Sequence, residues 1–189
     1  MMRNFLCLAL LSLLAVACNT DMVSRIKEDE MQNGGYIRTV SPYPVGNATF
    51  SVSKANMGGT KMELVAEAVT PNQGALFSTY ELSIKFIDAT PANGSFTTAV
   101  LPLKTLTATT FTKDATTGYP RSTITVTGTE ALTATKLTEA NVSNGDRFEI
   151  TGTMRLTDGK SFSAANTGAN ITGGAFYSSP FVYRLNVVN

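Results

Sequence analysis

The chain of 189 residues contains no histidine and no tryptophan, and it has only two cysteines. Without histidine, its side chains cannot form a Ser-His-Asp or Cys-His nucleophile system. The absence of histidine also removes the usual partner of cysteine in zinc sites. We therefore expect a protein that is not an enzyme and that holds no metal and no other cofactor.

An excess of charge of one sign is also lacking, because 15 basic residues face 14 acidic ones. Nucleic-acid binding needs a concentrated positive surface, so no nucleic-acid partner is expected.

A glycine-rich phosphate loop is missing, since the sequence GGAF at 173–176 precedes an expected strand rather than a helix. Long runs with helical spacing are absent, whereas Thr, Gly and Asn are frequent. This composition favours β-structure with many turns.

One remaining route to hydrolysis is a pair of carboxylates, and Glu63 and Glu67 share one face of an expected strand. Four residues of extended chain separate them by about 13 Å. Glycoside hydrolysis uses separations of ~5 to 9.5 Å, so we interpret both residues as solvated surface acids.

The acidic residues expected in turns do not reproduce the spacing of a calcium-binding loop. The alternative of a calcium ion held by residues from separate loops stays open. These acidic residues are Asp88, Asp114, Asp146 and Asp158.

The N-terminus has a positively charged Arg3 followed by an apolar stretch over residues 5–17. This stretch is too short to span a hydrocarbon core of ~30 Å, so it predicts a secretory signal peptide at 1–17. The small residues Ala15 and Ala17 precede Cys18, and LAVAC resembles a bacterial lipobox with Ala in place of Leu. The resemblance implies that Cys18 carries lipid and becomes the new N-terminus. The alternative is an ordinary leader that leaves Cys18 as a free thiol.

Lipid on Cys18 would anchor the protein stably to a membrane, because several acyl chains hold far better than one. Cys7 leaves with the leader, so the mature chain has no partner for a disulfide. Residues 18–34 are polar and charged and run into a glycine pair, which predicts a flexible tether. The acidic triplet Glu28–Glu30 is either a solvated spacer or, by resemblance, the acid-rich signal that moves lipoproteins of Bacteroidota to the cell surface.

From residue 36 onward, apolar and polar residues alternate, as they do in half-buried antiparallel strands. The expected strands are 36–40, 48–53, 61–69, 79–87, 99–106, 122–127, 147–157 and 181–188. One short helix is expected over 130–137, with Thr129 as its N-cap. Turn sequences separate these segments, and Asp158-Gly159 is a good signal for a tight hairpin.

About eight or nine strands, each with one apolar face, bury these faces best when they form two sheets that pack against each other. We therefore predict an all-β fold, namely a single immunoglobulin-like antiparallel β-sandwich over residues 35–189 with one short helix. No internal repeat points to a propeller or a solenoid.

Three tyrosines lie outside the alternating runs, in connections rich in proline and glycine: Tyr43, Tyr119 and Tyr177. Flat aromatic faces recognise sugars, and binding residues are often carried on loops of a rigid scaffold. Arg121, next to Pro120, would add a hydrogen-bonding fork. The alternative is that these rings cap the ends of the sandwich core, and the lack of tryptophan favours this alternative.

Several stretches resemble a group of uncharacterised outer-membrane lipoproteins of Bacteroidota. They are NGGYIRTV, GYPRSTITVT, the segment from EALTATKL to SFSAAN, and ITGGAFYSSPFVYRLNVV, which cover most of the chain from Asn33 onward. Members of that group accompany starch-utilisation-type systems, in which a TonB-dependent transporter works with a surface lipoprotein. The resemblance implies a lipid-anchored outer-membrane protein that faces the cell exterior, but it transfers no catalytic or ligand residue.

Two functional hypotheses follow. The first is a non-catalytic accessory of a nutrient-uptake system, which binds oligosaccharide near a TonB-dependent transporter and its surface lipoprotein. The second is a structural or interaction module that docks on the transporter complex without binding a small ligand. Aromatic residues on loops favour the first hypothesis, whereas a flat apolar patch on one sheet face would favour the second.

Overall fold

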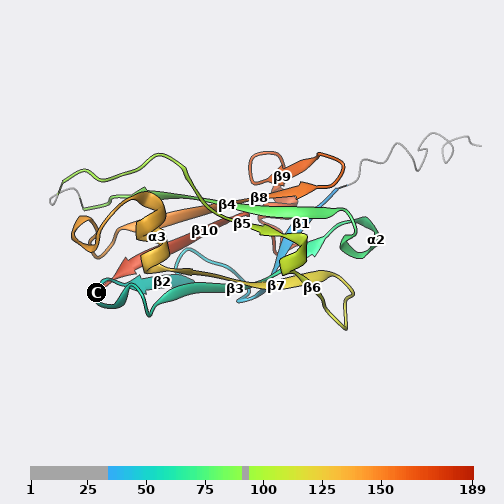
Figure 1. The fold of residues 1–189 in the computed structure, drawn as a ribbon, viewed down its shortest axis with the longest axis horizontal. Helices are drawn as coiled ribbons and strands as arrows, with labels where there is room; N and C mark the ends of the chain where they lie inside the picture. Colours follow the sequence, from blue (N-terminus) through green and yellow to red (C-terminus); the bar gives the residue numbers. More distant parts are fainter. Residues whose placement is uncertain (1–33, 91–93) are drawn as a thin grey trace, which may run out of the picture. The chain divides into compact units, whose positions relative to one another are not determined.

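The computed structural model describes residues 34–90 and 94–189, and Figure 1 shows two layers of strands over this part of the chain. The strands are β1 (Tyr36–Ser41), β2 (Phe50–Ser53), β3 (Lys61–Val69), β4 (Phe77–Ile87), β5 (Leu101–Thr107), β6 (Thr112–Lys113), β7 (Pro120–Thr127), β8 (Arg147–Leu156), β9 (Ser161–Ser163) and β10 (Val182–Val188). The helices are α2 (Pro71–Gly74), α3 (Gly128–Thr135) and α4 (Ala169–Thr172), with single 3-10 turns η2 (Lys54–Asn56), η4 (Ala108–Thr110) and η5 (Glu139–Asn141). The predicted signal peptide, Cys18 and nearly all of the predicted tether lie outside the described residues.

The strand order confirms the predicted immunoglobulin-like β-sandwich. One sheet has the order β1-β3-β7-β6, and the other has the order β2-β10-β8-β4-β5, with β9 paired to β8. These orders correspond to the A-B-E-D and G-F-C sheets of immunoglobulin domains, with β5 added beside C and β2 added beside G. All strand pairs are antiparallel except β2 and β10, which run parallel. The exception arises because the chain leaves the first sheet after β1 and continues in the same direction beside the last strand (Figure 1).

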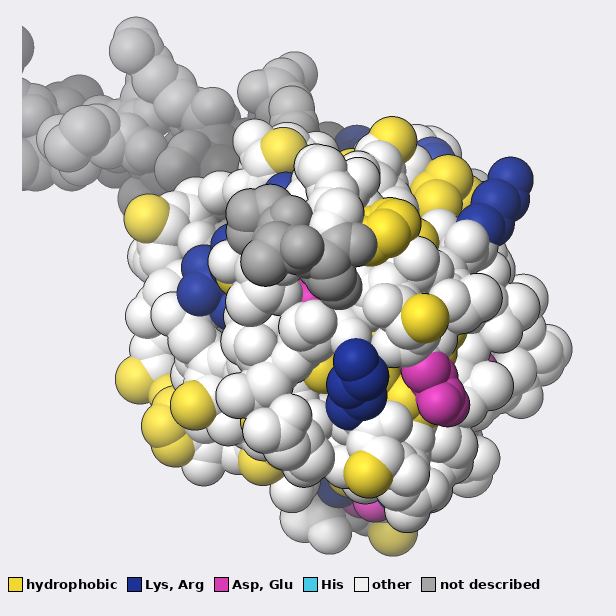
Figure 2. Space-filling model, turned by 90° about the vertical axis from the view of Figure 1, so that its left-hand side faces the viewer, with side chains coloured by type: hydrophobic (Ala, Val, Ile, Leu, Met, Phe, Trp, Pro, Cys, Tyr) yellow, Lys and Arg dark blue, Asp and Glu magenta, His cyan; other side chains and the backbone are white. Residues whose placement is uncertain are grey.

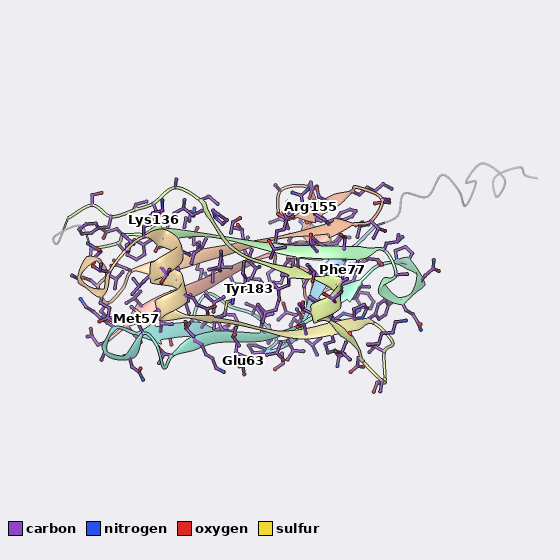
Figure 3. The ribbon with its side chains drawn as sticks, in the orientation of Figure 1. Met57, Glu63, Phe77, Lys136, Arg155 and Tyr183 are labelled. Carbon is purple, nitrogen blue, oxygen red and sulfur yellow. The ribbon has the colours of Figure 1, made fainter. Side chains whose placement is uncertain are left out.

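The core between the sheets is filled by the inward positions of the alternating strands. Tyr80, Phe86, Phe148 and Tyr183 are fully buried, and the rings of Phe86 and Phe148 lie 5.1 Å apart. Figure 3 shows Tyr183 between the two layers, whereas Glu63 lies on the outer side of β3. The apolar alternation in the sequence therefore gave the correct inward face for the long strands.

Gly152 occupies an inward position in the middle of β8, where the other inward residues have large side chains. The ring of Tyr80 on β4 fills the space beside it, and a Cβ atom on Gly152 would lie 2.0 Å from the Tyr80 hydroxyl oxygen. That hydroxyl has no hydrogen-bond partner among the described residues, and burial raises the pKa of Tyr80 well above its ordinary value. The core is thus closed around Tyr80 with no room for a larger residue at 152.

The predicted helix exists, but its predicted bounds and N-cap were wrong. Helix α3 spans Gly128–Thr135 and its N-cap is Thr127, not Thr129. The hydroxyl of Thr127 accepts a hydrogen bond from the backbone N–H of Glu130, and the Glu130 carboxylate accepts one from the Thr127 N–H. This capping box satisfies two backbone donors at once, which a cap at Thr129 does not do. Lys136 then adopts a left-handed conformation and ends the helix before residue 137.

Helix α3 crosses from one sheet to the other at one end of the domain, near the C-terminus (Figure 1). The beginning of β1, helix α2 and strand β9 lie at the opposite end. The hairpin signal at Asp158-Gly159 is confirmed, since this turn joins β8 to β9. Within the described residues, no helix is long and apolar enough to cross a membrane.

Candidate ligand-binding groove

A groove of about 490 Å³ opens at the end of the domain that carries α2 and β9. Its walls come from the start of β1, the end of β3, the residue before β7, β9 and helix α4. The lining residues are Gly34, Gly35, Tyr36, Val69, Thr70, Pro71, Tyr119, Phe162, Asn166, Thr167, Gly168, Ile171 and Tyr177. The volume lies within the range of ~300 to 1,000 Å³ that is usual for small-molecule sites.

Four of the thirteen described residues that line the groove are aromatic, namely Tyr36, Tyr119, Phe162 and Tyr177. The rings of Tyr36 and Tyr177 meet edge to face with 5.2 Å between their centres. Phe176 makes the same kind of contact with Tyr177 at 5.1 Å, so three rings follow one another in a row. Arg38 donates a hydrogen bond of 3.0 Å to the hydroxyl of Tyr36, which restrains the orientation of that ring. Such edge-to-face contacts hold aromatic side chains in defined orientations.

The hydroxyl groups of Tyr119 and Tyr177 make no hydrogen bond within residues 34–90 and 94–189. Both can therefore bond to a polar ligand without breaking an existing contact. Among the described residues that line the groove there is no Asp, Glu, Lys or Arg. The site combines apolar aromatic surface with neutral hydroxyl groups, which suits an uncharged ligand that has both apolar faces and hydroxyl groups.

Tyr119 is held in place by the tight loop that precedes β7. The backbone N–H of Asp114 donates to the carbonyl of Tyr119 at 2.9 Å, and the N–H of Gly118 donates to the carbonyl of Asp114 at 2.8 Å. The Asp114 carboxylate accepts hydrogen bonds from the backbone of Thr117 and Thr116, which lower its pKa together with the nearby Arg121. This loop fixes one wall of the groove.

The same loop is tied to the outer face of the sheet by Glu67. The interpretation of Glu63 and Glu67 as two solvated acids is wrong for Glu67, which is completely buried. It holds for Glu63, since 49% of that side chain is exposed. Arg38 and Arg121 reach Glu67 from the two neighbouring strands, with N–O distances of 2.8 Å and 2.6 Å. The hydroxyl of Thr117 also donates to Glu67 at 2.8 Å and so covers it from the loop.

Of the predicted ligand-binding residues, the structure brings Tyr119 and Tyr177 together in the groove. Tyr43 lines a neighbouring hollow, and its hydroxyl donates to the carbonyl of Ala175 at 2.8 Å. Arg121 does not line the groove, since its guanidinium is bonded to Glu67 and to Asp114. It is a positioning residue for the Tyr119 loop rather than a free hydrogen-bonding fork.

The sequence pattern missed Tyr36 as a groove residue because it stands at the beginning of an alternating strand. The exposed Phe176, which contacts Tyr177 but does not itself line the groove, was also missed, although it directly precedes Tyr177 in the same glycine-rich loop. Its position beside a candidate residue, in a segment without alternation, was a usable signal.

The acidic residues predicted in turns serve the loops that contain them. Asp146 is buried and accepts hydrogen bonds from the backbone of Ala89 and from the hydroxyl of Thr90, which joins two loops. Asp88 accepts from the backbone of Phe96 in the same region. In the part of the chain that the structure describes, no group of three or more Cys, Asp or Glu residues is arranged to hold a metal ion.

Figure 2 shows the opposite end of the domain, around α3, where charged side chains are few and apolar side chains are scattered in small groups. A smaller hollow of about 300 Å³ lies between α3 and β5 and is lined by Pro102, Leu103, Thr129, Glu130, Thr133 and Ala134. It contains no aromatic residue and includes a carboxylate that already pairs with Lys104 at 2.9 Å. The groove with three tyrosines is therefore the stronger candidate site.

No protein-family model matches the chain, and no curated protein matches its sequence.

Proposed function

We propose that the protein is a surface-anchored outer-membrane lipoprotein that binds uncharged glycans as a non-catalytic accessory of a nutrient-uptake system. The observation that carries this proposal is the groove lined by Tyr36, Tyr119 and Tyr177, which has no charged side chain among its described lining residues. A TonB-dependent transporter and its surface lipoprotein are the proposed partners, and they rest on the sequence resemblance alone.

Glycan binding fits the chemistry of the groove for two reasons. Each sugar ring has faces of C–H groups that pack on aromatic rings, and the tyrosine rings of the groove supply such surfaces. Each ring also carries hydroxyl groups, which the phenol groups of Tyr119 and Tyr177 can bind. A carboxylated or sulfated sugar would enter without a cation to pair with, because the lining residues are all uncharged.

Replacing Tyr119 by alanine is expected to weaken glycan binding about tenfold, because one wall of the groove loses its aromatic face. The measurement is affinity electrophoresis of the full-length protein in detergent through gels that contain neutral polysaccharides, with acidic polysaccharides for comparison. Val100→Ala is the control, since Val100 is another exposed apolar side chain but does not line the groove.

Retardation of the wild-type protein by a neutral polysaccharide, reduced in Tyr119→Ala and unchanged in Val100→Ala, is the expected result. A wild-type protein that no polysaccharide retards, and that instead copurifies with a large outer-membrane barrel, would favour the alternative of an interaction module.

Membrane anchoring through Cys18 is a second part of the proposal and has its own test. We expect a palmitate analogue fed to the native host to label the wild-type protein, and Cys18→Ala to lose this label because the thiol is the proposed acyl acceptor. Cys7→Ala is the matched control, since Cys7 lies within the predicted leader. Equal labelling of Cys18→Ala and wild type would refute the anchoring and the localisation that depends on it.

A further inference from the structure

Phe176 stands in the sequence between residues that line two different concave surfaces. Tyr177 lines the groove, and Ala175 lines a second hollow of about 190 Å³ that contains Tyr43. We call this second surface the side hollow; its lining residues are Tyr43, Pro44, Val45, Thr172, Gly173, Gly174, Ala175, Ser178, Ser179 and Pro180. The segment from α4 to β10, which we call the ridge, thus contributes residues to both the groove and the side hollow.

The phenyl ring of Phe176 stands exposed on this ridge, with 80% of its surface in contact with solvent. A large apolar side chain that is this exposed marks a contact surface when it forms part of a larger apolar site. Here its ring contacts Tyr177, which in turn contacts Tyr36, so the row of rings continues from the groove to the crest of the ridge.

The backbone of the ridge is fixed by hydrogen bonds to β1. The N–H of Thr39 donates to the carbonyl of Ser178 at 2.7 Å, and the Ser178 hydroxyl donates to the carbonyl of Thr39 at 2.9 Å. The bond from Tyr43 to Ala175 holds the other side of the ridge. Phe176 is therefore presented to solvent by a loop whose neighbouring residues are held by hydrogen bonds.

Ser179 adds an independent observation in the side hollow. This residue is 1% exposed, and its hydroxyl has no hydrogen-bond partner among the described residues. A buried hydroxyl without a partner is unfavourable, so a group that supplies one is stabilised there. The Ser179 oxygen has almost no contact with solvent, so a sugar hydroxyl in the side hollow reaches it after rotation of the side chain. Such a hydroxyl then has the required chemistry, because it both donates and accepts.

We propose that the groove and the side hollow are two subsites of one extended site for a linear chain of uncharged sugars, with Phe176 as the stacking platform between them. This inference rests on the proposed function and adds a dependence on chain length. A short oligosaccharide fills the groove alone, whereas a longer chain crosses the ridge over Phe176 and places its next unit beside Tyr43 and Ser179.

The test measures affinity by calorimetry for short and long linear glucose oligomers with the full-length protein in detergent. The probes are maltose and cellobiose as short members, and long maltooligosaccharides and cellooligosaccharides as long members. Wild-type protein is expected to bind the long member of one series more tightly than the short member. Phe176→Ala is expected to lower affinity for the long member about tenfold and to affect the short member much less, because the groove keeps its own lining residues and loses only the contact from Phe176 to Tyr177.

Two further variants separate the inference from the proposed function. Tyr119→Ala is expected to lower affinity for short and long members alike, because both occupy the groove. Ser179→Ala is expected to affect only the long member, and Val100→Ala to affect neither.

The inference is overturned if Phe176→Ala lowers the affinity for short and long members equally, or lowers neither. It is also overturned if the wild-type protein binds none of the four probes or does not prefer the long member. A neutral peptide that binds the wild-type groove more tightly than any of these sugars would likewise overturn it. The proposed function is judged separately, by whether the polysaccharide panel retards the wild-type protein.

Discussion

Gly152→Ala is expected to lower the free energy of unfolding by about 3 kcal/mol. The new Cβ would lie 2.0 Å from the Tyr80 hydroxyl oxygen and 2.3 Å from the ring carbon that bears it. Neither β4 nor β8 can yield easily, because they pair along nearly their whole length in the middle of the second sheet. A loss of this size is a large part of the ~5 to 15 kcal/mol that stabilises a typical domain.

The measurement is urea unfolding followed by circular dichroism, with Gly46→Ala as the control. A Cβ on Gly46 would meet only the Thr49 hydroxyl oxygen, at an ordinary contact distance of 3.7 Å, so little change is expected. A double-mutant cycle with Tyr80→Leu tests the cause, because a smaller side chain at position 80 leaves room for the methyl group. If Gly152→Ala costs the same in both backgrounds, the contact with Tyr80 is not the reason for the loss.

Glu67→Ala is expected to lower the free energy of unfolding by about 3 kcal/mol. The carboxylate is fully buried and bound by Arg38, Arg121 and Thr117, so its removal leaves two guanidinium groups without their common partner. Both arginine side chains keep some contact with water, at 29% and 26% exposure, which keeps the loss below that of a fully buried charge. Glycan binding is expected to weaken as well, because the loop that positions Tyr119 loses its attachment to β3.

Glu63→Ala is the matched control for this prediction. Glu63 lies on the same strand and the same outer face, but it is half exposed, and its one ion pair within residues 34–90 and 94–189 is with Lys61. An exposed ion pair contributes about 0 to 1 kcal/mol, so unfolding of Glu63→Ala is expected to resemble that of the wild type. Equal losses of unfolding free energy in the two variants would show that the buried Glu67 contributes no more to stability than the exposed Glu63 does.

The long strands could be predicted from the sequence because their burial pattern is local. Strands β3, β4 and β8 repeat apolar residues at every second position, and a shift by one residue would turn the whole set toward water. Strands β6 and β9 have two and three residues, too few for alternation to show. The start of α3 was misplaced because threonines stand at both 127 and 129, and only the first is three residues from Glu130.

The burial of Glu67 could not be predicted, because it depends on residues that are distant in the sequence. Its position on the outer face follows from the alternation and is correct. Its burial requires Arg38 from β1 and Arg121 from β7, and both arrive only when the strands pair. Thr117 completes the cover from a loop whose path no local pattern specifies.

The groove was likewise predicted only in part, because some of its residues stand in a recognisable local sequence pattern and others are brought in by contacts between distant parts of the sequence. Tyr119 and Tyr177 were predicted from their loop contexts, and the fold brings them to one site. Tyr36 was hidden by its place in a strand, and the role of Arg121 depends on Glu67 and Asp114, which the sequence did not link to it. Residue type and loop chemistry therefore predicted part of the candidate site, whereas its geometry depends on tertiary contacts.

The most direct test of the glycan-binding account is NMR chemical-shift mapping on the full-length protein in detergent, titrated with fragments of a neutral polysaccharide that retards it in the gel assay. The account predicts that the largest shifts fall on Tyr36, Tyr119 and Tyr177 and on the neighbouring residues of the groove. Shifts gathered around the hollow between α3 and β5, with the three tyrosines unmoved, would contradict it.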